Sequence, residues 1–172
     1  MSKVSNLSNQ NKLNASLNKE VLLLMNLSEF RSHKTEPNKG ISYQEFIKNK
    51  MLIVYAIRAG IPYTFFEQIQ AHTPFTENDW IVFLDLSSKS LQRYKAEASH
   101  TFKPSHTEKI FEVAEVSEYG LETFGSMDKF KLWLQTPNYS LGKLTPMELL
   151  KDSYGKEMVM AELTRINYGI LA

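Results

Sequence analysis

Apolar residues recur every three or four positions along most of the chain, and start and stop signals divide this pattern into helices. The first clear start is Ser42 with Glu45, a capping box that predicts a helix over 42–59 ending at Gly60. No run alternates apolar and polar residues between hairpin turns, so we predict an all-α fold. The other expected helices cover 63–71 and 154–167 and begin near Thr76, Ser87, Ser105, Ser126 and Thr145.

The first 41 residues lack these signals, and we predict that they form a separate, partly flexible N-terminal extension. Residues 1–18 are rich in Ser and Asn and predict a flexible tail. Residues 20–30 are apolar and fit either a helix or a strand. Residues 31–40 predict a loop, because charge, Pro and Gly leave little to bury.

The segment WIVFLDLSSKSLQRYK, residues 80–95, has the pattern of a helix-turn-helix within an expected region over 42–104. Ser87 caps the second helix and Leu91 is its inward anchor. In this motif the second helix enters the DNA major groove, where Arg and Gln read bases and Lys neutralises phosphate. The candidate DNA-binding residues are Ser88, Lys89, Gln92, Arg93 and Lys95.

An ordinary corner between two helices with a solvated basic face explains the same segment. Three acidic residues flank the preceding helix, where they would repel phosphates: Glu77, Asp79 and Asp85. The net charge of +1 is unevenly distributed, because residues 87–109 carry five basic and two acidic residues between two acidic blocks. A basic segment of this size attracts phosphate only modestly.

Composition narrows the function classes further. The chain has no Cys, which excludes disulfides and thiolate metal sites and fits a cytoplasmic protein. No apolar run approaches the length of about 20 residues that spans a bilayer, and no secretory signal is evident, so we expect no membrane association.

Catalytic and metal-binding motifs are also missing from the sequence. There is no Gly-rich phosphate loop or nucleophile elbow, and the four His lack HxxxH or HExxH spacing. The helix expected from Ser105, with Glu108 as its capping-box partner, carries Ile110, Ala114, Leu121 and Phe124 near one face. Four glutamates on this helix predict a solvent-exposed face: Glu112, Glu115, Glu118 and Glu122. We therefore expect no enzyme, no metal and no cofactor.

The C-terminal part, 105–172, combines this connecting helix with three short helices joined by stiff connectors. Pro137 and Pro146 fix φ, and Gly142 permits a turn. Gly155 falls in the first turn of the last helix, where a side chain would clash with a neighbour. Taken alone, the segment fits a small helical cap on the preceding helix.

The order of these residues nevertheless resembles the pattern of a known protein family. The pattern W-L-x-x-P-N-x-x-L-G-x-x-x-P-x-x-L-L from Trp133, followed by a Gly and by R-I-x-x-G-I-x-A at the terminus, resembles the toxin-binding domain of the Xre/MbcA/ParS antitoxins. The segments IRAGIP and LDLSSKSLQRYK resemble the helix-turn-helix of the same family, so the similarity covers about 50–172. The sequence departs from the family at Lys143, where a second Gly is common, and at Tyr94, where an Arg is common.

The resemblance implies an Xre-like antitoxin that binds a RES-type toxin, one that consumes NAD or transfers ADP-ribose, and covers its active site. It also implies binding to operator DNA, autorepression and a homodimer that occupies paired half-sites. We further hypothesise that the apolar terminus RINYGILA fills a cleft of the toxin. The expected toxin-binding residues are Trp133, Pro137, Asn138, Leu141, Gly142, Arg165, Tyr168, Gly169, Ile170, Leu171 and Ala172.

Two alternatives use the same sequence features. A stand-alone helix-turn-helix repressor needs the basic residues but no toxin. A protein-interaction module that does not bind DNA needs the C-terminal domain alone. Charge reversal of Lys89 and Arg93 separates these two alternatives.

Overall fold

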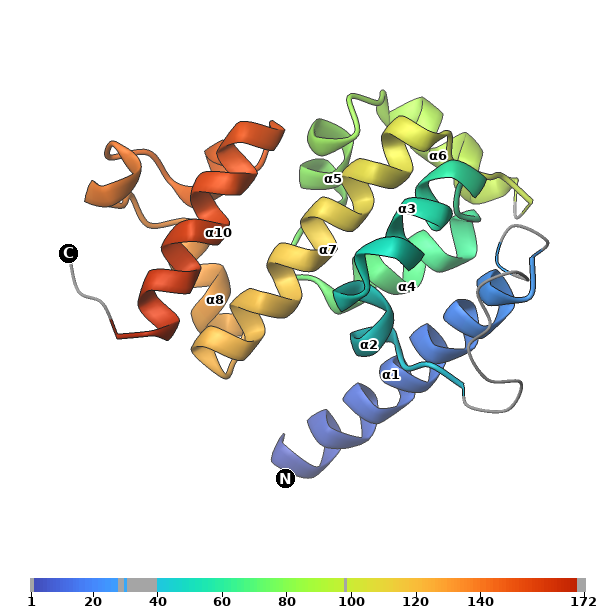
Figure 1. The fold of residues 1–172 in the computed structure, drawn as a ribbon, viewed down its shortest axis with the longest axis horizontal. Coiled ribbons are helices and arrows are strands. Elements are labelled where there is room, and N and C mark those ends of the chain that lie inside the picture. The colour runs from blue at the N-terminus through green and yellow to red at the C-terminus, as the bar shows by residue number, and fades with distance from the viewer. Residues whose placement is uncertain (1, 28–29, 31–39, 98, 170–172) are drawn as a thin grey trace. The chain divides into compact units, whose positions relative to one another are not determined.

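A computed structural model describes residues 2–27, 30, 40–97 and 99–169 (Figure 1). Within these residues there are ten α-helices, a short 3-10 helix η2 and no β-strand, which confirms the predicted all-α class. None of the described helices is long and apolar enough to cross a membrane. The helices are α1 (Ser2–Met25), α2 (Tyr43–Lys48), α3 (Lys50–Ala59), α4 (Tyr63–His72), α5 (Glu77–Phe83), α6 (Ser88–Ala96), α7 (Pro104–Phe124), α8 (Met127–Leu134), η2 (Tyr139–Leu141), α9 (Pro146–Leu149) and α10 (Ser153–Asn167).

These helices group into two compact units that do not follow the order of the sequence. The first unit contains Met1–His72 and Gln92–Glu108, and the second contains Thr73–Leu91 and Lys109–Ala172. Helices α6 and α7 each contribute residues to both units. The expected division into 1–41, 42–104 and 105–172 stays a prediction.

The N-terminal extension begins with α1, so the flexible tail predicted over 1–18 is wrong for the residues that the structure describes. Leu17, Val21 and Leu24 follow helical spacing and are at most 3% exposed. Helix α1 packs on α2 and α4 in the first unit. The tail prediction failed because the apolar stripe starts only at Leu17, after a stretch rich in Ser and Asn.

Polar contacts also fix α1 within the first unit. The backbone N–H of Tyr43 donates to Asn18 Oδ1 at 2.8 Å, and the Thr64 hydroxyl donates to Glu20 Oε2 at 3.0 Å. The apolar run predicted over 20–30, which fitted either a helix or a strand, is helical through Met25. The loop predicted over 31–40 lies outside the described residues except for its last position.

The helix predicted over 42–59 is broken at Asn49 into α2 and α3. Asn49 adopts an extended conformation (φ −92°, ψ 96°), and its side-chain oxygen accepts a hydrogen bond from Leu52 N–H at 3.2 Å. An Asn side chain competes with the helical backbone in this way, which the apolar periodicity of residues 42–59 does not show. The capping box of Ser42 and Glu45 is confirmed.

After α3, the chain turns at Gly60, as predicted. Gly60 has a φ of +75°, and a Cβ atom there would lie 2.4 Å from the carbonyl oxygen of Phe102. Phe102 N–H donates to the carbonyl oxygen of Ile61 at 2.8 Å, which holds the two segments together. Gly60 is therefore needed both for its conformation and for this close approach.

Helix α7 begins at Pro104, so the capping box predicted at Ser105 is wrong. The carbonyl oxygen of Lys103 accepts from the backbone N–H groups of His106 (3.1 Å) and Thr107 (3.0 Å). Proline suits the first helical position because its φ is fixed and no N–H is needed there. His106 lies in the first turn of α7.

Candidate functional site

The segment that we predicted as a helix-turn-helix begins with α5, which starts after Thr76 as predicted. Thr76 N–H donates to Asp79 Oδ2 at 2.7 Å, and the Thr76 hydroxyl accepts from Asp79 N–H at 3.2 Å. The turn after α5 contains Asp85, which has a φ of +49°. Ser87 then caps α6 by accepting from Ser90 N–H at 3.1 Å.

Helix α6 exposes every predicted DNA-binding residue. Leu91 is 2% exposed and is the inward anchor, as expected. The Arg93 guanidinium lies 5.3 Å from the centroid of the Tyr94 ring, a cation–π distance. The residues exposed on α6 include Ser88, Lys89, Gln92, Arg93 and Lys95.

An aromatic cluster that the sequence did not predict packs against the C-terminal end of α6. The His100 ring stacks on the Tyr94 ring with centroids 3.5 Å apart, and it meets Phe102 edge-on. The Nε2 atom of His100 is buried and has no hydrogen-bond partner among the described residues. Burial lowers the pKa of His100, an effect that Glu97 opposes and Arg93 reinforces.

In the second unit, α8 packs on the bare backbone of α7. A Cβ atom at Gly120 would lie 2.3 Å from the Phe130 ring, so only Gly allows this approach. Phe130 is fully buried, and the half-buried Trp133 stacks beside it with centroids 6.0 Å apart. Trp133 thus belongs partly to the packing of this unit, although it was predicted as a toxin contact.

The connector after α8 is organised around Asn138. Its backbone N–H donates to the carbonyl oxygen of Leu144 at 3.0 Å, and its own carbonyl accepts from Lys143 N–H at 2.9 Å. Its side-chain oxygen accepts from Ser140 N–H at 2.9 Å. These bonds close the turn in which Gly142 adopts a φ of +69°.

A series of side-chain hydrogen bonds joins the connector to α10. The Asn138 amide donates to Glu162 Oε1 at 3.3 Å, and Arg165 donates to Glu162 Oε2 at 3.2 Å. The structure therefore brings together two predicted toxin-binding residues, Asn138 and Arg165, through a glutamate that the sequence did not single out. The Asn138 side chain links the connector to α10, whereas Arg165 pairs with Glu162 within α10 itself.

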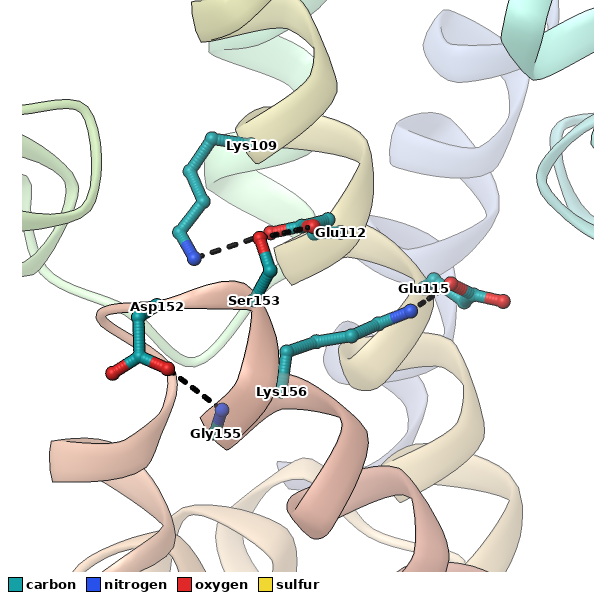
Figure 2. Close-up of polar contacts among 7 residues, drawn as sticks. All are labelled: Lys109, Glu112, Glu115, Asp152, Ser153, Gly155 and Lys156. Atoms are coloured by element: carbon teal, nitrogen blue, oxygen red, sulfur yellow. Dashed lines mark hydrogen bonds and ion pairs between the residues drawn. The ribbon is translucent and has the colours of Figure 1, made fainter.

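The start of α10 is fixed on residues 109–115 of α7 by the polar contacts shown in Figure 2. The Ser153 hydroxyl donates to Glu112 Oε1 at 2.9 Å, and Lys109 pairs with the other oxygen of Glu112 at 3.1 Å. Lys156 pairs with Glu115 at 2.7 Å.

Of the four glutamates of α7 that we predicted to be solvent-exposed, Glu122 is exposed, but the other three are buried or half-buried. Glu112 and Glu115 are engaged by α10, and Glu118 is only 5% exposed. Helix α7 is covered on more sides than its apolar positions indicated, because the polar side chains of α10 reach it.

Gly155 allows α9 to lie against the first turn of α10. A Cβ atom at Gly155 would come within 2.0 Å of the carbonyl oxygen of Leu149, so the predicted clash is confirmed. The N–H of Gly155 donates to Asp152 Oδ1 at 2.7 Å, which caps α10. The capping box of Thr145 and Glu148 at the start of α9 is also confirmed.

The remaining predicted toxin-binding residues differ in exposure. Leu141 is buried, whereas Pro137, Gly142, Tyr168 and Gly169 are exposed. The last three, Ile170, Leu171 and Ala172, lie outside the described residues.

The domain also exposes several large apolar side chains that were not among the predicted toxin-binding residues. Tyr139 is 85% exposed and Tyr154 is 84% exposed. The sequence signal for the exposure of Tyr139 was a large aromatic residue inside a turn-rich connector. The other exposed residues of this kind are Leu132, Leu144 and Met158.

Two comparisons with known proteins bear on this C-terminal domain. Residues 120–169 match the family described as the antitoxin Xre/MbcA/ParS C-terminal toxin-binding domain. The chain is also similar to the antitoxin Xre of Photorhabdus laumondii subsp. laumondii, with 26% identity over 117 residues, which cover 67% of this chain and 78% of that protein. The resemblance predicted from the sequence is confirmed.

Proposed function

We propose that the protein neutralises a RES-type toxin by covering its active site, because residues 120–169 match the toxin-binding domain of the Xre/MbcA/ParS antitoxins. The supporting observation is the set of aromatic and aliphatic side chains that the domain leaves in solvent, including Tyr139, Tyr154 and Tyr168. Exposed tyrosines on a rigid framework are typical of protein interfaces, because they bury much area at a small entropy cost.

The C-terminal segment RINYGILA supplies the occluding element in this proposal. Gly169 has a φ of +67°, so the chain leaves the axis of α10 just before the last three residues. Ile170 and Leu171 are apolar and would enter a cleft of the toxin. Residues 110–172 carry six basic and nine acidic residues, a balance suited to a site that binds an anionic nucleotide.

Deletion of residues 167–172 tests this proposal. The full chain and the shortened chain are each co-expressed with the toxin that co-purifies from the native host, and growth and cellular NAD are measured. We expect the full chain to restore both and the shortened chain to restore neither. Thermal unfolding of the shortened chain serves as a control for the fold, and full neutralisation by it would contradict occlusion by the tail.

We also propose that a homodimer of this chain binds operator DNA and represses its own operon. The exposed polar face of α6 supports this second function, with Lys89 and Arg93 as its principal cations. The charge-reversed variant K89E/R93E is expected to lose operator binding, whereas K151E, with an equally exposed lysine near α10, is not. A salt-dependent affinity for the wild-type chain is expected, since phosphate contacts release counterions. Equal operator binding by both variants would favour the interaction module without DNA binding.

A further inference from the structure

Two consecutive residues in the connector have left-handed backbones. Gly142 has a φ of +69° and Lys143 has a φ of +67°. Glycine adopts this conformation freely, but a residue with a Cβ atom is disfavoured in it. Lys143 and Asp85 are the two non-glycine residues with positive φ among those described.

The fold itself does not need the Lys143 side chain. The turn is closed by backbone groups, with Lys143 N–H on the carbonyl oxygen of Asn138 and Asn138 N–H on that of Leu144. A glycine at position 143 would make the same bonds without the conformational cost. The Lys143 side chain is exposed and, within the described residues, forms no ion pair.

The Lys143 side chain is instead held over the exposed ring of Tyr139. Its Nζ atom lies 5.9 Å from the centroid of that ring, within cation–π range. The carbonyl oxygen of Tyr139 accepts from Gly142 N–H at 3.1 Å, so both side chains project from one closed turn. The turn thus presents a cation beside an aromatic face that is 85% exposed, next to the half-exposed Leu144.

We propose that Tyr139 and Lys143 form a specificity-determining contact with the toxin, whose matching surface offers a carboxylate beside an apolar patch. This inference rests on the proposed toxin binding. Lys143 is one of six basic residues among 110–172, which carry nine acidic residues. Its positive charge is therefore a distinctive feature at one position of the proposed interface. A partner with a basic side chain at that position would be rejected by like-charge repulsion.

Competition for the toxin tests the proposal with the full chain. A complex of tagged wild-type chain and toxin, purified from the native host, is challenged with untagged wild type or with K143G, K143E or Y139A. The control variant K151E alters an exposed lysine elsewhere in the domain. Thermal unfolding of each free chain is measured in parallel.

We expect K143G to unfold at a higher temperature than wild type yet compete about tenfold more weakly, because a fixed cation–carboxylate contact is lost. K143E should compete about a hundredfold more weakly, Y139A about tenfold more weakly, and K151E like wild type. Wild-type competition by K143G and K143E would overturn the inference while leaving toxin binding intact. If untagged wild type itself failed to compete and no toxin co-purified, the proposed function would fall as well.

Discussion

The side-chain amide of Asn138 donates a hydrogen bond to the carboxylate of Glu162, 24 residues further along the chain. Every other polar group of Asn138 is used within the connector, by Ser140, Lys143 and Leu144 among others. This one side chain therefore joins the closed turn to α10. It helps to fix the position of Tyr139 and Lys143 relative to α10, together with the packing of η2 on α10.

Replacing Asn138 by alanine is expected to lower the free energy of unfolding by about 1–3 kcal/mol, because the N–H of Ser140 and the Glu162 carboxylate lose a partner. Urea unfolding measures the change. The matched control is N167A, since Asn167 is exposed at the last position of α10. Equal stability of the two variants would show that the Asn138 contacts contribute nothing.

The coupling between Asn138 and Glu162 can be measured separately. A double-mutant cycle with N138A and E162A isolates the pairwise energy, which is expected to be about 1 kcal/mol. The salt link of Glu162 with Arg165 remains in N138A, so R165A provides a third variant that perturbs only the other oxygen. Strict additivity of N138A and E162A would argue against an interaction between them.

Replacing Gly155 by alanine is expected to lower the free energy of unfolding by a larger amount. In G155A the new methyl group would overlap the backbone of Leu149, which is not free to move away as a long side chain is. We expect α9 to be displaced from α10 and the free energy of unfolding to fall by about 3 kcal/mol or more. The control is G40A, since nothing lies within 4 Å of that position. A stability of G155A within about 0.5 kcal/mol of wild type would contradict the packing described for α9.

The ion pair of Lys156 and Glu115 gives a prediction about salt. Both side chains are less than one quarter exposed, and their charged atoms are 2.7 Å apart. K156M should lower the free energy of unfolding by about 1 kcal/mol at low ionic strength, and by less at high ionic strength. K151M, which removes an exposed lysine, is the control. The difference between the two variants should shrink as sodium chloride is added, and a difference of zero at low salt would contradict the contribution of the pair.

Local signals in the sequence predicted most of the helix boundaries. The helix starts predicted at Ser42, Thr76 and Thr145 are confirmed, because each is fixed by a capping box whose contacts span three residues. The box expected at Ser105 failed because Pro104 fits the first helical position better. Boundaries were thus predictable wherever the deciding bond is local.

Features that depend on tertiary contacts were not predictable in this way. Helix α1 is held by residues of α2 and α4, so its Ser- and Asn-rich sequence looked flexible in isolation. Glu118 was expected in solvent because periodicity alone cannot show that α7 is covered on several sides. In the candidate site, the motif identified Asn138 and Arg165, but their shared partner Glu162 is seen only once the connector and α10 are placed together.

The lowered pKa of His100 leads to a prediction of how the free energy of unfolding depends on pH. Burial lowers the pKa of His100 below its ordinary value of 6.5, with Glu97 opposing and Arg93 adding to this effect. The unfolded chain therefore takes up the proton at a higher pH than the folded chain. The contribution of neutral His100 to stability is complete above pH 6.5 and is lost as the pH falls from there through the folded-state pKa.

The variant H100F keeps an aromatic ring on Tyr94 and Phe102 but cannot bind a proton. Its free energy of unfolding should vary less than that of wild type between about pH 7 and pH 5, where histidines titrate. H106F is the matched control, because His106 also meets the Phe102 ring, with centroids 6.1 Å apart. Urea unfolding across this range gives the slopes. If H100F retained the wild-type slope while H106F flattened it, the titrating group would be His106, and protonation of His100 would not govern the stability of the stack on α6.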